Sequence, residues 1–439
     1  MSAARDCNRA GQRVVLINDG PLGGDCTFTG CVPSKAIISA AARGVSFREA
    51  FEHAATVVGQ IADTENAEVL RGEGVEVLEG RGRFRDPHTI EVDGTVISYG
   101  SAVVATGSGP FVPPIPGLDQ IEYLTNENIF ELRTAPSSMA VLGGGPIGCE
   151  LAQALQRLGV QVTVFEMADR LLTREEPESS AVVQSALEYD GVTVHVGAGV
   201  TRAEPTDHGI RLHTDELAVE VESLLVAVGR TPTGDGAGLD TIGVELDARG
   251  HVVVDDQLRT SVANVFAVGD VTGLAPFTHA ADEMGRVAAA NTRARHRRLA
   301  RKFDAGPIPW VTFVDPEVAR VGITESEAAA FDGDVAYLPM TENDRAITEG
   351  RTEGFVKLIA GPRKLVGKRG GGELLGATVV AARGGEMIHE PALAMRTGMF
   401  TGRLAQTVHA YPSWSVAIQK AAAQFFVEVE GRRSRPARR

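Results

Sequence analysis

One stretch in the first half of the chain constrains its fold more than any other. The apolar segment MAVL begins at Met139 and leads into the glycine-rich loop GGGPIG at residues 143–148. The next residues, CELAQALQRLG, have the apolar spacing of a helix, and VQVTVFE then ends at Glu166. A strand, a G-x-G-x-x-G loop, a helix and an acidic residue about 20 positions on are the fingerprint of a dinucleotide-binding unit. The sequence therefore predicts a compact α/β protein.

Each glycine of this loop has a mechanical role. Gly143 permits the tight turn, Gly145 lets the backbone approach a pyrophosphate, and Gly148 lets helix and strand pack closely. The helix N-terminus faces the anion. Glu166 is expected to hold the ribose hydroxyls, and because a carboxylate repels a 2′-phosphate, we expect NADH to be preferred over NADPH. An ordinary glycine turn is the alternative, and the flanking strand, helix and acid disfavour it.

The start of the chain repeats the second half of this unit. When the sequence is shifted by 148 positions, Gly11 falls on Gly159 and RVVLIN at residues 13–18 falls on QVTVFE at residues 161–166. A chance match of one short helix and strand is the alternative. By this comparison the glycine loop of the first unit would lie about five residues before Met1, so we expect the true start to lie upstream.

Two of the four cysteines lie close together, in GGDCTFTGCVPSK. Ideal helix geometry would hold the Cα atoms of Cys26 and Cys31 roughly 8.6 Å apart, beyond the disulfide reach of about 7 Å. A bridge therefore needs a distorted turn, which Gly30 permits. Pro33 suits the first turn of a following helix, whose dipole, with Lys35, would lower the pKa of Cys31. Two buried small side chains or a zinc site are the alternatives, but no CxxC or CxxH supplies further ligands.

Charge and composition exclude several classes of function. The formal net charge of −14 argues against a basic nucleic-acid binder and against an anionic membrane surface as partner. No signal-like apolar core follows the start, and no run of 18 apolar residues occurs, so we expect a soluble cytoplasmic protein. The basic tail GRRSRPARR at residues 431–439 is interpreted as a solvated, disordered end.

Together with ATGSGPFVPPIPG at residues 105–117, AVGRTP at 227–232 and VFAVGD at 265–270, these motifs resemble the flavin-dependent pyridine nucleotide-disulfide oxidoreductases. The resemblance covers the chain from about Ala10 to Glu430. It implies a homodimer with two Rossmann-like dinucleotide-binding domains, for FAD and NAD(P)H, and a C-terminal α+β dimerisation domain. The expected domains are residues 1–134 and 256–305 for FAD, 135–255 for NAD(P) and 306–430 for dimerisation. The first part of the FAD domain lacks its first strand and glycine loop. The dimerisation domain is expected to close with a helix over residues 414–430.

The resemblance also implies roles for single residues. Hydride passes from NADH to the flavin and on to the Cys26–Cys31 disulfide, with Cys31 as the charge-transfer thiolate and Cys26 as the interchange thiol. Lys35 and Glu150 match an ion pair beside the flavin. Asp270 is expected to bind the flavin ribitol. The other residues expected to bind a cofactor are Asn18 and Asp19, which replace Glu166 in the first unit, and Gly24, Gly82, Thr106, Gly107, Ser108, Thr278, His279, Val200 and Gly229, the last two for NAD.

The C-terminal domain departs from the dithiol-reducing members of this family. Tyr411 and Val416 stand where those members have a His-Glu dyad, and His409 is expected to be a surface histidine. Tyrosine at this position is similar to mercuric reductase, although the terminal cysteine pair of that enzyme is missing. We therefore expect a metal-ion, quinone or disulfide acceptor. The alternatives are a dihydrolipoamide dehydrogenase-like diaphorase and a flavin-free nucleotide-binding module.

Overall fold

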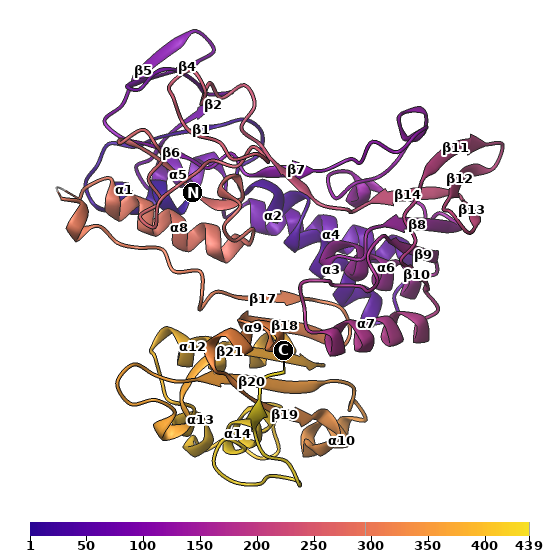
Figure 1. Ribbon diagram of the computed structural model, residues 1–439. Helices are drawn as coiled ribbons and strands as arrows, with labels where there is room; N and C mark the ends of the chain where they lie inside the picture. The colour runs from indigo at the N-terminus through magenta and orange to yellow at the C-terminus, as the bar shows by residue number, and fades with distance from the viewer. Residues whose placement is uncertain (295, 439) are drawn as a thin grey trace.

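The computed structural model describes residues 1–294 and 296–438, which fold into three regions (Figure 1). The N-terminal region carries two pairs of parallel strands, the central region a four-stranded parallel sheet, and the C-terminal region a six-stranded antiparallel sheet. In Figure 1 the C-terminal region, orange to yellow, lies below the other two. The strand and helix order confirms the predicted α/β class.

Among the described residues, no helix combines the length and the apolar character that a membrane crossing requires.

The N-terminal region is built on two separate strand pairs. β1 (Val15–Asn18) pairs with β2 (Glu76–Glu79), and β6 (Ala102–Val104) pairs with β16 (Val265–Ala267). All of β16 is buried, whereas every residue of β1 keeps intermediate exposure. The other elements of this region are α1 (Ser2–Arg9), α5 (Ala67–Gly72), β3 (Arg83–Asp86), β4 (Thr89–Val92), β5 (Thr95–Ser98), β7 (Ser108–Pro110) and α8 (Thr278–Asn291).

Three helices join this region to the centre of the molecule. They are α2 (Gly24–Phe28), α3 (Cys31–Ala42) and α4 (Phe47–Ala62). Helix α3 contacts both α4 and α6 (Pro146–Arg157). Ile37 and Ala40 of α3 belong to the same buried cluster as Leu151 and Leu155 of α6. The helix that starts at Cys31 is therefore packed directly on the helix that follows the glycine loop.

The central region has the strand order β10-β9-β8-β14, all parallel. Met139, Val141, Val162 and Val164 are fully buried, so this sheet forms the middle of a layered core. Its elements are β8 (Ser138–Leu142), β9 (Gln161–Glu166), α7 (Pro177–Tyr189), β10 (Thr193–Val196) and β14 (Ser223–Val226). A meander of β11 (Arg202–Thr206), β12 (Gly209–His213) and β13 (Ala218–Val221) adjoins it, and β15 (Arg230–Pro232) pairs with β7.

The C-terminal region has the strand order β17-β18-β21-β20-β19-β22. Its strands are β17 (Pro309–Thr312), β18 (Glu317–Gly322), β19 (Asp334–Pro339), β20 (Phe355–Gly361), β21 (Glu373–Ala381) and β22 (Arg435–Pro436). Its helices are α9 (Glu325–Ala328), α10 (Asp344–Glu349), α11 (Gly384–Met387), α12 (His389–Arg396), α13 (Thr401–Gln406) and α14 (Val416–Ala423).

Two sequence-based expectations for this region are wrong. The closing helix α14 spans only Val416–Ala423. The next residue, Gln424, is held by its side chain to both backbone groups of Tyr337 in β19. The basic tail is not a disordered end, because β22 pairs with β19 and Arg435 forms an ion pair with Glu325. Contacts with distant parts of the chain override the local pattern in both places.

Candidate active site

The two predicted redox cysteines meet across a break between two helices. Cys26 lies in α2, and Cys31 is the first residue of α3. Gly30 leaves no room for a side chain, because a Cβ atom there would lie 2.8 Å from the carbonyl oxygen of Asp25. Both cysteines are free thiols, and Cys31 Sγ lies 3.7 Å from Thr278 Oγ1. The segment therefore makes a turn that no continuous helix could make.

The two thiols differ in acidity. A hydrogen bond from Cys26, supported by the charge of Lys35 and by Thr278, lowers the pKa of Cys31 to about 6, although burial and Glu150 oppose this shift. The same hydrogen bond, together with burial, raises the pKa of Cys26. At neutral pH the reduced pair therefore holds a thiolate on Cys31 and a proton on Cys26.

An ion pair between a half-buried lysine and a buried carboxylate lies beside the thiols. Lys35 Nζ, from α3, lies 2.7 Å from Glu150 Oε2, from α6. The other Glu150 oxygen accepts the backbone N–H of Phe313 at 2.8 Å, and Lys35 lies 4.8 Å from the centre of the Phe313 ring. Because Glu150 is almost completely buried, these contacts fix the ammonium group in one place. The three regions of the chain therefore meet at this ion pair.

The glycine loop has the close approaches that the sequence predicts. Gly143 has a φ of 107°, and a Cβ atom there would lie 2.5 Å from the carbonyl oxygen of Ala227. A Cβ atom at Gly148 would overlap the carbonyl oxygen of Gly143. Gly145 is the N-cap of α6, and nothing lies within 4 Å of where its Cβ would be. The loop is open at Gly145, where a pyrophosphate could approach the helix N-terminus.

Glu166 is held at the end of β9 by two backbone groups. Its Oε2 accepts the N–H of Gly144 at 2.6 Å, and its Oε1 accepts the N–H of Ala168 at 2.7 Å. The Glu166 carboxylate is thus fixed beside the glycine loop. A group that distinguishes ribose hydroxyls from a 2′-phosphate needs such a fixed position.

A second polar cluster lies between β7 and β15. Ser108 Oγ donates to Asp270 at 2.7 Å and accepts from Arg230 Nε at 2.7 Å. Arg230 also forms an ion pair with Asp25, the neighbour of Cys26. Sequence reasoning missed Arg230 and Asp25, although both lie inside the motifs AVGRTP and GGDC. A charged residue inside each of these motifs was the signal that could have found them.

Other predicted cofactor residues occupy turns around these clusters. Thr106 and Gly107 directly precede β7, and Gly107 has a φ of 74°. Gly229 accepts the N–H of Phe111 at 3.0 Å through its carbonyl oxygen. His279 directly follows Thr278, and its Nε2 lies 2.6 Å from the carbonyl oxygen of Pro309.

The remaining predicted residues lie at the edges. Asn18 donates to the carbonyl oxygen of Gly20 at 2.7 Å, within its own turn, and Asp19 is exposed. Gly24 begins α2, Gly82 packs beside the Ile17 side chain, and Val200 packs half-buried against the apolar cluster under the central sheet.

The structure does not bring Tyr411 to the cysteines within one chain. Its side chain is 74% exposed, and its hydroxyl donates to Asp344 of α10, which lies far from α2 in Figure 1. His409 is not the expected surface residue. Only 7% of its side chain is exposed, because one ring nitrogen lies 3.0 Å from a Glu390 carboxylate oxygen and the other lies 2.9 Å from the carbonyl oxygen of Thr407.

Comparisons with known families cover most of the chain. Residues 1–285 match the pyridine nucleotide-disulphide oxidoreductase family, and residues 308–422 match the dimerisation domain of that family.

Curated relatives include two kinds of enzyme. The chain is 31% identical to a mercuric reductase of Bacillus cereus, over 98% of this chain and 70% of that one. It is 35% identical to dihydrolipoyl dehydrogenase 2 of Haloarcula marismortui, over 94% of this chain and 91% of that one.

Solved structures are also similar. The HOCl-induced flavoprotein disulfide reductase RclA from Escherichia coli superposes with a TM-score of 0.87 at 28% identity, over 96% of each chain. A Cu(II) complex of the same protein superposes with a TM-score of 0.85 at 26% identity, over 96% of each chain.

Proposed function

Because the chain belongs to the pyridine nucleotide-disulphide oxidoreductases, a family that uses FAD and NAD(P)H, we propose that it passes electrons from NADH through FAD to Cys26 and Cys31, and on to a soft metal ion. One observation carries this proposal. The turn at Gly30 brings two free thiols together beside Thr278, and the hydrogen bond between them lowers the pKa of Cys31 to about 6 and raises the pKa of Cys26. A pair poised in this way can be oxidised to a disulfide and reduced again.

The residues beside the thiols fit a flavin. Asp270 and Ser108 offer oxygen atoms to the hydroxyls of a ribityl chain, and Lys35 offers a positive charge to an anionic ring. FAD, when bound, would relay two electrons from NADH to the thiols. We propose the division into 1–134 and 256–305 for FAD, 135–255 for NADH and 306–430 for dimerisation, and the match to a dimerisation domain supports a homodimer.

The proposed thiol step balances in electrons and protons. A hydride carries two electrons and one proton, and a disulfide that accepts them becomes one thiolate and one thiol. These are the protonation states favoured for Cys31 and Cys26 at neutral pH. Reoxidation by a divalent metal ion would release the Cys26 proton, re-form the S–S bond and leave the metal reduced by two electrons, or two copper(II) ions reduced by one electron each.

Two observations support a metal-ion acceptor. Tyr411 replaces the histidine that would serve as general acid or base toward an organic disulfide. Soft metal ions need no such proton donor, and thiolates bind them well. The similarity to a mercuric reductase and to a protein that forms a Cu(II) complex points the same way.

A dihydrolipoamide dehydrogenase-like diaphorase is the second candidate, and one observation favours it. His409 and Glu390 form a largely buried histidine-carboxylate pair in the dimerisation domain, so a proton-transfer group is present two residues before the usual position. A quinone acceptor and a flavin-free nucleotide-binding module are the remaining alternatives.

An acceptor panel separates these candidates. FAD-loaded protein is mixed with NADH and with Cu(II), Hg(II), menadione or lipoamide, and NADH oxidation is followed without oxygen. We expect metal-dependent oxidation that is lost in both Cys26→Ser and Cys31→Ser. Oxidation that is fastest with lipoamide and is lost in His409→Gln would favour the diaphorase, and activity with menadione in both cysteine variants would favour direct quinone reduction. Protein that takes up no flavin would leave only the nucleotide-binding module.

A further inference from the structure

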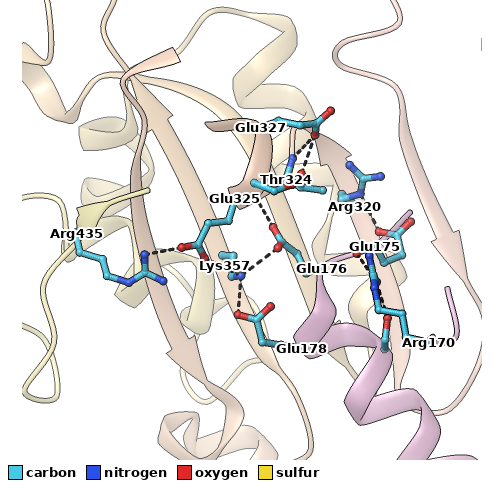
Figure 2. A network of polar contacts seen from close by, with 12 residues as sticks. Arg170, Glu175, Glu176, Glu178, Arg320, Thr324, Glu325, Glu327, Lys357 and Arg435 are labelled. Carbon is cyan, nitrogen blue, oxygen red and sulfur yellow. Dashed lines mark hydrogen bonds and ion pairs between the residues drawn. The ribbon is translucent and has the colours of Figure 1, made fainter. Parts of the chain in front are cut away.

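The segment between β9 and α7, residues 167–176, is held by buried charges from the C-terminal region (Figure 2). Arg320 Nε, from β18, lies 2.8 Å from Glu175 Oε2, and both side chains are less than one tenth exposed. The other Glu175 oxygen accepts the indole N–H of Trp310 at 2.8 Å, and the Arg320 guanidinium lies 4.2 Å from the centre of that ring. Arg320 also donates to the backbone carbonyl of Arg174 at 2.8 Å.

A second buried charge holds the next residues. Lys357 of β20 is 1% exposed, and its Nζ lies 3.2 Å from Glu176, 2.8 Å from Glu178 and 3.0 Å from Glu325. Arg435 of the tail supplies a further positive charge to Glu325, as Figure 2 shows. Burial opposes the charge on Lys357, but the three carboxylates outweigh it and raise the pKa of that ammonium group. Burial opposes the charge on Glu325 as well, but Arg435 and Lys357 lower the pKa of Glu325 to about 2. Lys357 and Glu325 are therefore both charged at neutral pH.

The same segment touches the glycine loop at its other end. The N–H of Leu172 donates to the carbonyl oxygen of Gly144 at 2.9 Å. Leu171 is fully buried, and a Cβ atom at Gly144 would meet its side chain. Gly144 is also the residue whose N–H bonds Glu166. A change in the position of this segment would therefore move Gly144 of the glycine loop and the Glu166 carboxylate, which the nucleotide would contact.

Internal bonds make the segment one unit between these two ends. Arg170 donates to the carbonyl oxygens of Thr173 at 2.7 Å and of Glu175 at 3.0 Å, and to Ser180 Oγ at 2.9 Å. Because of these bonds the segment moves as one unit. A displacement of Glu175 would therefore also displace Leu171 and Leu172.

We propose that Arg320 and Lys357, which belong to the dimerisation domain, are positioning residues for NADH: they hold residues 170–176 against the glycine loop and so set the affinity of the nucleotide site from across a domain boundary. The inference rests on NADH binding at Gly143–Gly148 and on no particular electron acceptor. A purely structural role is the competing explanation, and it predicts that stability and NADH affinity change together.

The test uses a variant that removes the Arg320–Glu175 ion pair without leaving a buried charge. In the double variant Glu175→Gln/Arg320→Met, the amide still accepts the Trp310 N–H, and neutral replacement of a buried ion pair often costs little stability. Calorimetric titration with NADH should show a dissociation constant raised about tenfold, with an unfolding midpoint close to that of the wild type. Lys357→Met/Glu176→Gln is the second variant, with the same direction expected for NADH affinity. It leaves no unpaired buried charge, because Glu325 keeps its ion pair with Arg435 and Glu178 is half-exposed.

Arg157→Gln is the matched control. Arg157 joins Asp190 of the central region to Asp315 of the C-terminal region, at 2.9 and 3.1 Å, from the end of α6 opposite the glycine loop. Its loss should lower stability and leave NADH affinity unchanged. Wild-type affinity in the folded Glu175→Gln/Arg320→Met variant would overturn the proposal. It would also fail if Arg157→Gln weakened NADH binding equally. A wild-type chain that bound no NADH would instead show that the nucleotide site itself is wrongly assigned, and the proposal would fall with it.

Discussion

The glycine loop (Gly143–Gly148) and the turn that holds the two thiols (Cys26–Cys31, the thiol turn) are each built around a glycine that cannot carry a side chain. They differ in how firmly they are held. Gly148 is a buried residue of α6 that lies close to the fully buried Val141 of β8, and Gly143 and Glu166 beside it are fixed by backbone contacts. The turn at Gly30 joins the end of α2 to the start of α3 and leaves Cys31 exposed. A nucleotide site needs a fixed shape, whereas a redox pair needs access and a tuned pKa.

The largest expected effect comes from adding one methyl group to each glycine. Gly148→Ala overlaps a backbone carbonyl inside the core, so we expect a loss of about 3 kcal/mol in the free energy of unfolding and NADH binding weakened at least about 100-fold. Gly30→Ala meets the Asp25 carbonyl less closely and should cost about 1 kcal/mol. Denaturant unfolding and calorimetry measure both effects.

Gly59→Ala is the control for this pair. Gly59 lies inside α4 with nothing within 4 Å of where its Cβ would be, so the substitution should stabilise the protein by up to about 1 kcal/mol. Equal costs at Gly148 and Gly30 would contradict the contrast between the two sites.

The next prediction concerns the charge that tunes the thiol turn. The Cys31 thiolate should form as the pH rises through about 6, so alkylation of this residue in the reduced protein should slow below that pH. The substitution Lys35→Met removes a positive charge that lowers the pKa of Cys31, so the pH midpoint of alkylation should rise. Alkylation of Cys31 below pH 7 should then slow severalfold. Peptide mass spectrometry separates Cys31 from the buried Cys7 and Cys149. An unchanged midpoint for Cys31 alkylation would show that Lys35 does not lower the pKa of this thiol.

The smallest expected effect lies at the nucleotide end. Glu166→Gln removes the negative charge but keeps an oxygen that can accept a backbone N–H. We expect the preference for NADH over NADPH to fall about fivefold, because the repulsion of a 2′-phosphate is gone. Calorimetric dissociation constants for the two nucleotides test this. A wild-type preference for NADPH would show that Glu166 does not select the cofactor.

The features that sequence reasoning predicted are local ones. The glycine loop, the turn at Gly30 and the helix starting near Cys31 each depend on residues within about one helical turn of one another, so their pattern is visible in the chain itself. The contact between Lys35 and Glu150 joins residues far apart, and only a family resemblance suggested it.

The features that it missed depend on packing between distant segments. Arg230 and Asp25 lie 205 positions apart, and Lys357 lies 181 positions from Glu176, so no spacing rule pairs them. The tail has the composition of a disordered end, but the free edge of β19 offers it a partner strand. His409 looked like a surface residue because it lies in the loop between α13 and α14, whereas its partner, Glu390, lies in α12, 19 positions earlier.

Counting thiols shows whether electrons from NADH reach the Cys26–Cys31 pair. The oxidised, FAD-loaded protein is given one equivalent of NADH per subunit without oxygen, and new thiols are alkylated and located by mass spectrometry. We expect two new thiols for each NADH consumed, on Cys26 and Cys31. Consumption of NADH without new thiols at these two positions would contradict the proposed electron transfer.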